Sequence, residues 1–203
     1  MHLIPTQDEV VAVLRETGAL RQGHFEYPTG LHSNEYLQVP LALRYYQHQR
    51  MLSVGLSRLL RANSEIRAIM RELSIVTPMT GGLPVAYGIC EAVRARQVYW
   101  AEREHHEPLR FRQYLEPQSG EQVVLVDDIL RTGTRLEELR QLLISRGATV
   151  VGLAVIIYQP TPKTLNFGNL PLYYLAKLEG SYYVDGARCE WCQRGVPLQK
   201  VWV

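Results

Sequence analysis

The run Val123-Val124-Leu125-Val126-Asp127-Asp128-Ile129-Leu130-Arg131-Thr132-Gly133-Thr134 decides how the rest of the chain is interpreted. Its first four residues are apolar and mostly β-branched, which predicts a short buried strand. Two aspartates follow at the carboxyl end of that strand, and a Thr-Gly-Thr turn comes next. From Leu136 leucines recur at helical spacing, Gly147 is placed to end the helix, and a second apolar run covers 148–157. This order is that of a βαβ unit, so we expect a parallel sheet.

The residue types in this run indicate a ligand. A loop that enters a helix presents unpaired N–H groups and the positive end of the helix dipole, and both suit a phosphate. Asp127 and Asp128 would repel a phosphate, but as carboxylates they accept hydrogen bonds from a sugar diol. A phosphate beside a diol is a ribose 5-phosphate. The alternative is an ordinary strand end with solvated acids, and the strand before and helix after the acids argue against it.

A second loop of the same kind follows the short strand Ile75-Val76. It reads Thr77-Pro78-Met79-Thr80-Gly81-Gly82-Leu83-Pro84 and leads into a helical pattern through Val93. Paired glycines let the backbone approach an anion closely and direct successive N–H groups at it. A tight turn is the other interpretation of a lone Gly-Gly. Two such loops on one sheet predict a site for two anions.

Residues 101–120 are mostly polar and show no helical or strand periodicity. So long a structureless stretch is usually a lid, a binding loop or a disordered segment. It contains Glu102-Arg103-Glu104-His105-His106, and composition alone also fits a solvated charged loop. The first lysine of the chain is Lys163, so any positive charge in this stretch comes from arginine or histidine.

The run 123–134 resembles the 5-phosphoribosyl-1-pyrophosphate (PRPP) signature of the type I phosphoribosyltransferases. Within that family the chain is most similar to the orotate phosphoribosyltransferases, whose N-terminal hood carries a pattern like Gly23-His24-Phe25, Thr29-Gly30, His32-Ser33 and Tyr36. The resemblance implies an α/β fold in which helices flank a central parallel sheet and a small hood covers the base. It implies one domain, 1–203, with a hood of about 1–40 plus a C-terminal segment and a core of about 41–160.

The resemblance also implies an activity. Orotate phosphoribosyltransferases join orotate to PRPP, giving orotidine 5′-phosphate and pyrophosphate in de novo pyrimidine synthesis. The cofactor would be Mg²⁺ carried by PRPP, with no direct protein ligand to a metal. The family's mobile catalytic loop closes over the neighbouring subunit's site, which implies a homodimer. A phosphoribosyltransferase for another base and a non-catalytic PRPP-binding regulatory protein remain as alternatives.

Site residues follow from the resemblance position by position. Catalytic roles are implied for Asp127, Asp128, Arg103 and His105. Base contacts are implied for Phe25, Tyr27, Arg131 and Tyr158. PRPP contacts are implied for Thr77, Thr80, Gly81, Gly82, Asp127, Asp128, Ile129, Leu130, Arg131, Thr132, Gly133, Thr134 and Arg135.

Three positions near this chemistry depart from the family pattern. The family usually has a threonine where this chain has Arg131, and a serine or threonine where it has Arg135. After the strand 148–157 the family shows an Asp-Arg pair whose arginine contacts orotate, whereas this chain continues Ile157-Tyr158-Gln159-Pro160. Because arginine–carboxylate pairs are strong, we expect Arg131 to replace the lost contact. The competing interpretation is a pocket for a different base.

Composition limits the remaining possibilities. Hydrophobic residues make up 46% of the 203 residues and charged residues 21%, as in soluble globular proteins. A net charge of +2, with no basic run, gives no indication of nucleic-acid binding. No apolar stretch reaches the length of a membrane span, and the first residues lack the form of a signal peptide, so a cytoplasmic location is expected.

The three cysteines, Cys90, Cys189 and Cys192, do not suggest a disulfide framework. The last two form a Cys-x-x-Cys with no second pair, so a zinc site there would need outside ligands. A redox pair would need a thioredoxin-like context, which is missing. A structural turn is therefore favoured. A Cys-x-x-Cys-x-x-Gly-x-Pro ending also resembles the orotate branch of the family.

Overall fold

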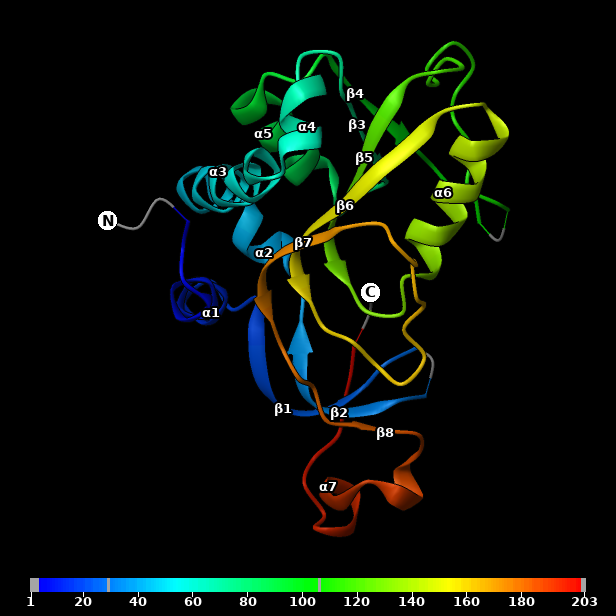
Figure 1. Cartoon of the computed structure of the whole chain (residues 1–203). Helices are drawn as coiled ribbons and strands as arrows, with labels where there is room; N and C mark the ends of the chain where they lie inside the picture. Colours follow the sequence, from blue (N-terminus) through cyan, green and yellow to red (C-terminus); the bar gives the residue numbers. More distant parts are fainter. Residues whose placement is uncertain (1–3, 29, 106, 202–203) are drawn as a thin grey trace.

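The computed structural model describes residues 4–28, 30–105 and 107–201, so Thr29 of the expected hood pattern and His106 of the expected loop lie outside the described residues. A five-stranded sheet has the order β4-β3-β5-β6-β7, and every neighbouring pair is parallel (Figure 1). Its strands are β3 Ser74–Pro78, β4 Gln97–Ala101, β5 Gln122–Leu130, β6 Thr149–Tyr158 and β7 Leu172–Lys177. The predicted α/β fold with a central parallel sheet is confirmed.

Helices cover both faces of this sheet. One face carries α1 Gln7–Glu16, α3 Tyr46–Ala62, α4 Ser64–Ile69 and α5 Leu83–Val93, with α2 Pro40–Leu43 beside them; the other carries α6 Thr134–Ser145. Side chains alternate along β5: Val124 and Val126 belong to the cluster of the first face, and Val123 and Leu125 to that of the second. Burial on both faces explains why the strand is a continuous apolar run.

Strand β5 is longer than its apolar run suggested. It continues through both aspartates to Leu130, because its backbone keeps pairing with β6, where Ile129 lies opposite Ile157 and Leu130 opposite Tyr158. The acids therefore lie within the ordered end of the central strand. This places them at the sheet edge that faces the hood (Figure 1).

The hood is a second, four-stranded sheet with the order β8-β2-β1-β9. The hairpin of β1 Leu20–Glu26 and β2 His32–Leu37 is joined by two C-terminal strands, β8 Tyr182–Tyr183 and β9 Gln199–Lys200. Between those two strands lie the short helices η1 Gly186–Arg188 and α7 Glu190–Gln193, at the end of the molecule away from the parallel sheet (Figure 1). Strand β7 belongs to the parallel sheet although it lies beyond residue 160, the boundary expected for the core.

The stretch 101–120 is not structureless, which corrects the expectation from its periodicity. Glu102 and Arg110 form an antiparallel bridge with backbone hydrogen bonds of 2.9 Å in both directions. Leu109 and Phe111 are buried in the cluster beneath α6. Two apolar residues in a charged stretch produce no recognisable pattern, so only the packing reveals this anchored hairpin, of which residues 102–105 and 107–110 are described.

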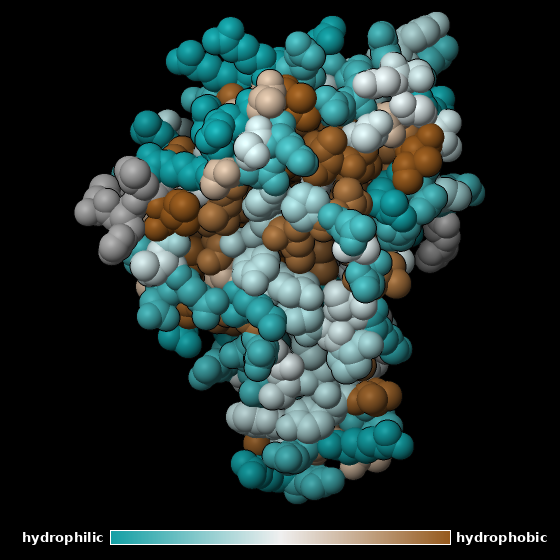
Figure 2. All heavy atoms as spheres, viewed as in Figure 1, coloured by the Kyte–Doolittle hydropathy of each residue, from teal (hydrophilic) through white to brown (hydrophobic). Residues whose placement is uncertain are grey.

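Hydrophobic side chains on the face shown in Figure 2 gather over the part of the molecule that contains the parallel sheet, whereas the hood end is mostly hydrophilic or intermediate. Within the part of the chain that the structure describes, no helix combines the length and the apolar character needed to cross a membrane.

The helix α3 depends on its buried face for stability. Leu56 is completely buried against the sheet, and its replacement by alanine leaves a cavity. We expect Leu56→Ala to lower the free energy of unfolding by about 2–5 kcal/mol in urea titrations. The control is Tyr46→Ala on the same helix, where the side chain is 71% exposed and the change should stay within about 0.5 kcal/mol. Equal unfolding midpoints for the two variants would contradict this packing.

Candidate active site

Two adjacent carboxylates occupy the end of the central strand. Asp127 is 4% exposed and Asp128 is 8% exposed, and the backbone N–H of Asp128 donates to Oδ1 of Asp127 at 2.9 Å. Burial and the neighbouring charge of Asp128 hold the pKa of Asp127 well above its usual range, with Arg135 opposing part of that shift. Burial also raises the pKa of Asp128, against the opposing effect of Asp127's hydrogen bond and the charge of Arg131. Such a buried acidic pair is costly unless it binds something.

The glycine pair of the other loop packs directly against these acids. A Cβ added at Gly81 would lie 2.9 Å from Oδ1 of Asp128, and one added at Gly82 would lie 2.9 Å from Oδ1 of Asp127 and 2.1 Å from Oγ1 of Thr77. No side chain fits at either position while the carboxylates stay in place. The two loops singled out in the sequence therefore meet at one site.

The loop 131–135 turns sharply into α6. Gly133 has a φ of +78°, which favours glycine, and an added Cβ would lie 2.8 Å from the ring of Phe167. The hydroxyls of Thr132 and Thr134 lie 3.1 Å apart on the same side of the turn. With the N–H groups at the start of a 12-residue helix, these hydroxyls form a cradle suited to a phosphate.

Arg135 joins the two loops, because its guanidinium donates to the carbonyl of Met79. In the loop that it reaches, Thr77 is fully buried at the end of β3, whereas Thr80 is exposed. The two loops are thus held together by the Arg135 guanidinium, whose charge also acts on the acid pair.

Arg131 points in the other direction, toward the hood. Its Nε donates to Oε1 of Gln159 at 2.9 Å, and Nη2 donates to the carbonyl of Leu37 at 2.9 Å. Its guanidinium carbon lies 5.5 Å from the centre of the Tyr27 ring, within reach of a cation–π interaction. Burial raises the pKa of Tyr182 to about 12, with Arg131 opposing that shift. Arg131, Tyr27 and Tyr182 thus lie together on the side that faces the hood, and we call them the arginine–tyrosine wall.

The acid pair with its phosphate cradle and the arginine–tyrosine wall all line one cavity of about 310 Å³. It is lined by Tyr27, Pro28, Leu31, Asp127, Asp128, Ile129, Leu130, Arg131, Thr132, Gly133, Thr134, Arg135, Leu136, Thr161 and Tyr182. The acids and phosphate cradle lie at the end of the parallel sheet, and the arginine–tyrosine wall lies under the hood. Tyr182 lines the cavity and Gln159 contacts Arg131, although neither is among the site residues expected from the sequence, because strand pairing and packing decide their positions.

Some residues expected at the site lie elsewhere. Phe25 is 3% exposed and packs with Tyr36 inside the hood, and Tyr158 lies against Tyr174 at a neighbouring hollow, so neither lines this cavity. Gln159, the residue after Tyr158, is the one that reaches Arg131. Of the four expected base contacts, Tyr27 and Arg131 line this cavity together with Tyr182, whereas Phe25 and Tyr158 do not.

The expected catalytic residues of the hairpin 102–110 are also outside this cavity. Arg103 forms an ion pair with Glu138 on α6, and the backbone N–H of Leu109 donates to the other oxygen of Glu138 at 2.7 Å. His105 is exposed and has a φ of +52°. Both expected catalytic residues lie on a surface hairpin of the same chain, away from Asp127 and Asp128.

Comparisons with known proteins agree with this geometry. A family model described as "Phosphoribosyl transferase domain" matches residues 56–166. The orotate phosphoribosyltransferase of Carboxydothermus hydrogenoformans is 32% identical over 185 residues, covering 91% of this chain and 92% of the relative. That of Thermotoga maritima is 31% identical over 188 residues, covering 93% and 94%. The crystal structure of orotate phosphoribosyltransferase from Aeropyrum pernix has a TM-score of 0.62 at 20% identity, covering 83% of this chain and 93% of that one, which shows a shared fold.

The buried acid pair predicts a pH-dependent cost in stability. Because the pKa of Asp127 is higher in the folded than in the unfolded protein, the folded state is favoured at low pH and loses stability as pH rises toward the folded pKa. We expect Asp127→Asn to raise the melting temperature near neutral pH, with a gain that shrinks toward about pH 4. Thermal melts across this range measure it.

The matched control for this substitution is Asp8→Asn, which changes an exposed aspartate in the first turn of α1. This variant should gain no stability as pH rises. A melting temperature of Asp127→Asn that is equal to or below that of the wild-type protein at neutral pH would show that burial does not penalise the Asp127 carboxylate.

Proposed function

The chain belongs to the phosphoribosyltransferase family, and from that membership we propose that it is an orotate phosphoribosyltransferase. The reaction joins orotate to PRPP and yields orotidine 5′-phosphate and pyrophosphate, as in de novo pyrimidine synthesis. One observation carries the proposal: a single cavity combines a buried acid pair, a phosphate cradle and a wall made of Arg131, Tyr27 and Tyr182. These are the groups that a ribose, a 5-phosphate and an anionic planar base require.

The ribose and its 5-phosphate fit the two halves of the strand–loop motif. Carboxylates accept hydrogen bonds from hydroxyls, so Asp127 and Asp128 would hold the ribose diol. The N–H groups and hydroxyls of residues 132–134 would hold the 5-phosphate at the start of α6. Ile129 and Leu130 line the cavity between these groups, and Arg135 would add positive charge beside the phosphate.

The expected chemistry is a dissociative displacement at the anomeric carbon. As the bond to pyrophosphate breaks, positive charge develops on the ribose, and fixed buried carboxylates favour that charge more than solvated ones would. The leaving pyrophosphate would lie against the loop 77–82, where Gly81 and Gly82 allow close approach of backbone N–H groups. Thr77 and Thr80 flank these glycines in the same loop.

The base would lie against Arg131. Gln159 and the Leu37 carbonyl hold this guanidinium over Tyr27, so it is preorganised to pair with the orotate carboxylate. Gln159 lies in the segment where the family has its orotate-contacting arginine, and here it orients an arginine that comes from the phosphate loop. The segment that lacks the family's arginine therefore positions Arg131, the arginine that would replace it.

Magnesium fits this donor set. Mg²⁺ prefers oxygen ligands and usually binds through substrate phosphates with only one or two carboxylates. Asp127 and Asp128 are buried carboxylates whose ionised forms are disfavoured, so a cation on bound PRPP would stabilise both. When bound, Mg²⁺ would neutralise charge on the leaving pyrophosphate.

A homodimer would give the hairpin 102–110 a catalytic role. Arg103 and His105 lie outside their own chain's cavity, but on a second copy the hairpin would cover the partner's site and bring positive charge to its pyrophosphate. The ion pair between Arg103 and Glu138 would exchange for that contact. Histidine at the hairpin tip is a plausible proton carrier near neutral pH.

The decisive assay follows the loss of orotate absorbance with PRPP and Mg²⁺. We expect turnover in the wild-type protein, and a fall of at least about 100-fold in Asp127→Asn and Asp128→Asn, because each removes charge that stabilises the developing cation. The matched control is Asp185→Asn, at an exposed position outside the cavity, which should keep full activity.

Two outcomes would redirect the proposal. Single-turnover release of pyrophosphate with a base other than orotate would assign the protein to a different member of the family. No release with any base, while PRPP still raises the melting temperature, would indicate a PRPP-binding regulatory protein.

Arg131 is expected to determine affinity for the base. We expect Arg131→Thr to raise the KM for orotate by about 10- to 100-fold, because a charge-assisted hydrogen bond contributes about 1.5–3 kcal/mol. Affinity for PRPP, measured by calorimetry, should change little. Gln159→Ala should raise the KM for orotate by a smaller factor, because the Arg131 guanidinium stays in place and loses only one of its hydrogen bonds. Unchanged orotate affinity in Arg131→Thr would remove Arg131 from the base site.

A further inference from the structure

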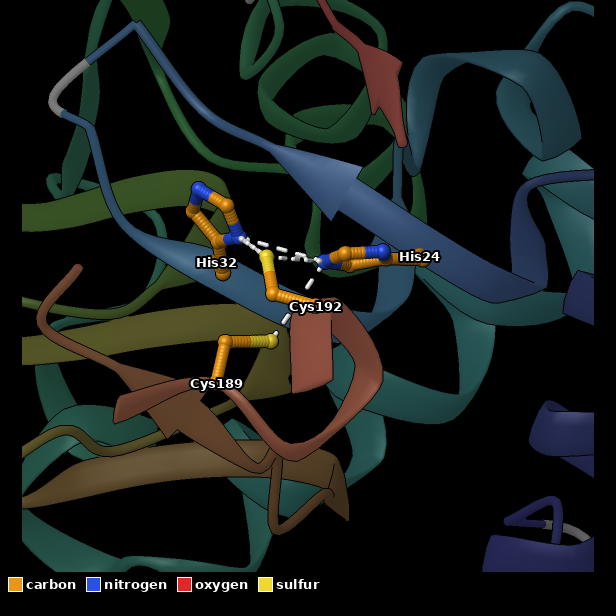
Figure 3. Close-up of side chains that lie close together, drawn as sticks. All are labelled: His24, His32, Cys189 and Cys192. Atoms are coloured by element: carbon orange, nitrogen blue, oxygen red, sulfur yellow. Dashed lines mark hydrogen bonds between the residues drawn. The ribbon is translucent and has the colours of Figure 1, made fainter. Parts of the chain in front are cut away.

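Four side chains that the proposed reaction does not use converge inside the hood. His24 comes from β1, His32 from the start of β2, and Cys189 and Cys192 from the segment around α7. One ligand atom from each lies within 4.8 Å of the other three. Figure 3 shows the two imidazole rings and the two sulfur atoms directed at a common centre. Residues more than 150 positions apart along the chain therefore meet at one point.

Hydrogen bonds cannot account for all of the close contacts within this cluster. Nε2 of His24 lies 3.1 Å from Nδ1 of His32, 3.4 Å from Sγ of Cys189 and 3.6 Å from Sγ of Cys192. An imidazole nitrogen has either one proton or one lone pair, so it cannot make three such bonds at once. Nδ1 of His32 also lies 3.4 Å from Sγ of Cys192. One cation between the four atoms would satisfy all of them together.

The spacings match a tetrahedral zinc site. With Zn–N near 2.05 Å and Zn–S near 2.3 Å, the edges of the tetrahedron are about 3.3 Å between nitrogens and about 3.6 Å between nitrogen and sulfur. The nitrogen–nitrogen distance here is 3.1 Å, and three nitrogen–sulfur distances are 3.4, 3.6 and 3.4 Å. Four of the six separations are thus close to those that a shared ion would impose, and the other two are at most 4.8 Å.

A neighbouring carbonyl orients the first histidine for this role. Nδ1 of His24 lies 2.9 Å from the carbonyl oxygen of Val196, and a carbonyl only accepts, so Nδ1 carries the proton. Nε2 then presents its lone pair to the cluster. Metal-bound histidines are commonly oriented in this way by a partner on the other ring nitrogen.

We propose that His24, His32, Cys189 and Cys192 bind one structural Zn²⁺ ion. Two imidazoles and two thiolates are a ligand set that favours zinc, and four protein ligands close the coordination sphere, as in structural rather than catalytic sites. His24, His32 and Cys189 are buried, which keeps the ion from solvent. The Cys-x-x-Cys was interpreted as a structural turn because it lacked further ligands; the hairpin β1–β2 supplies both of them.

Such an ion would stabilise an otherwise weak part of the fold. Among the residues that the structure describes, the buried hydrophobic cluster of the hood consists of Phe25, Tyr27, Tyr36 and Val201, with Leu31 and Tyr182 partly buried against it. A core of this size gains much from a metal cross-link. The ion would join the segment around α7 to the hairpin β1–β2, and Tyr27 and Tyr182 lie on these two parts of the hood at the cavity wall.

Metal analysis of the purified full-length protein tests this site directly. We expect about one zinc per chain by mass spectrometry of the wild-type protein expressed with added zinc. Cys189→Ser, Cys192→Ser and His24→Gln should each lose most of that zinc. The matched control Cys90→Ser changes the third cysteine, on α5 outside the cluster, and should retain it.

Removal and exchange of the metal give a readout that does not depend on the variants folding. A strong chelator should lower the melting temperature of the wild-type protein, and Zn²⁺ but not Mg²⁺ should restore it. Protein loaded with Co²⁺ should show intense visible bands and a thiolate-to-cobalt charge-transfer band, as tetrahedral sulfur ligation requires. Wild-type protein without bound zinc, or with a Cys189–Cys192 disulfide in its place, would overturn the proposal, as would full zinc content in the cysteine variants.

Discussion

The site depends on one constraint, the burial of two adjacent carboxylates at the ordered end of the central strand. Asp127 and Asp128 are almost completely removed from solvent, and burial raises the pKa of both. Their surroundings follow from that placement. Gly81 and Gly82 lack side chains because the carboxylates occupy the space where a Cβ would be, and Arg135 adds positive charge while joining the two loops.

A second consequence concerns Arg131. Arg131 follows the strand end directly, yet its side chain turns away from the phosphate cradle toward the hood, where Gln159, the Leu37 carbonyl and the Tyr27 ring hold it. A single loop therefore contributes to two parts of the cavity: its threonines lie at the start of α6, and its arginine faces the hood. The chain can therefore differ from the family pattern at residue 131 and in the segment 157–160 and still have an arginine at the cavity wall, held there by Gln159.

The hood connects the wall formed by Arg131, Tyr27 and Tyr182 to the C-terminal segment. Its sheet takes two strands from the N-terminal hairpin and two from the C-terminal segment. Residues near both ends therefore contribute to one small core and to one side of the cavity. The cluster of His24, His32, Cys189 and Cys192 lies at the junction of the two segments, so a cross-link there would act on the geometry of Tyr27 and Tyr182 without touching a substrate.

By itself the sequence determined the βαβ unit, the parallel sheet, the two glycine loops and the acid pair, because each of these rests on local pattern: apolar runs, helical spacing and turn residues that are contiguous in the chain. Tertiary structure alone decided which tyrosines reach the cavity, that Gln159 rather than Tyr158 contacts Arg131, that Leu109 and Phe111 anchor the hairpin 102–110, and that two histidines complete the set begun by Cys-x-x-Cys. Those contacts join residues tens to more than a hundred positions apart, and side-chain direction at a strand end is set by pairing and packing that no local pattern encodes.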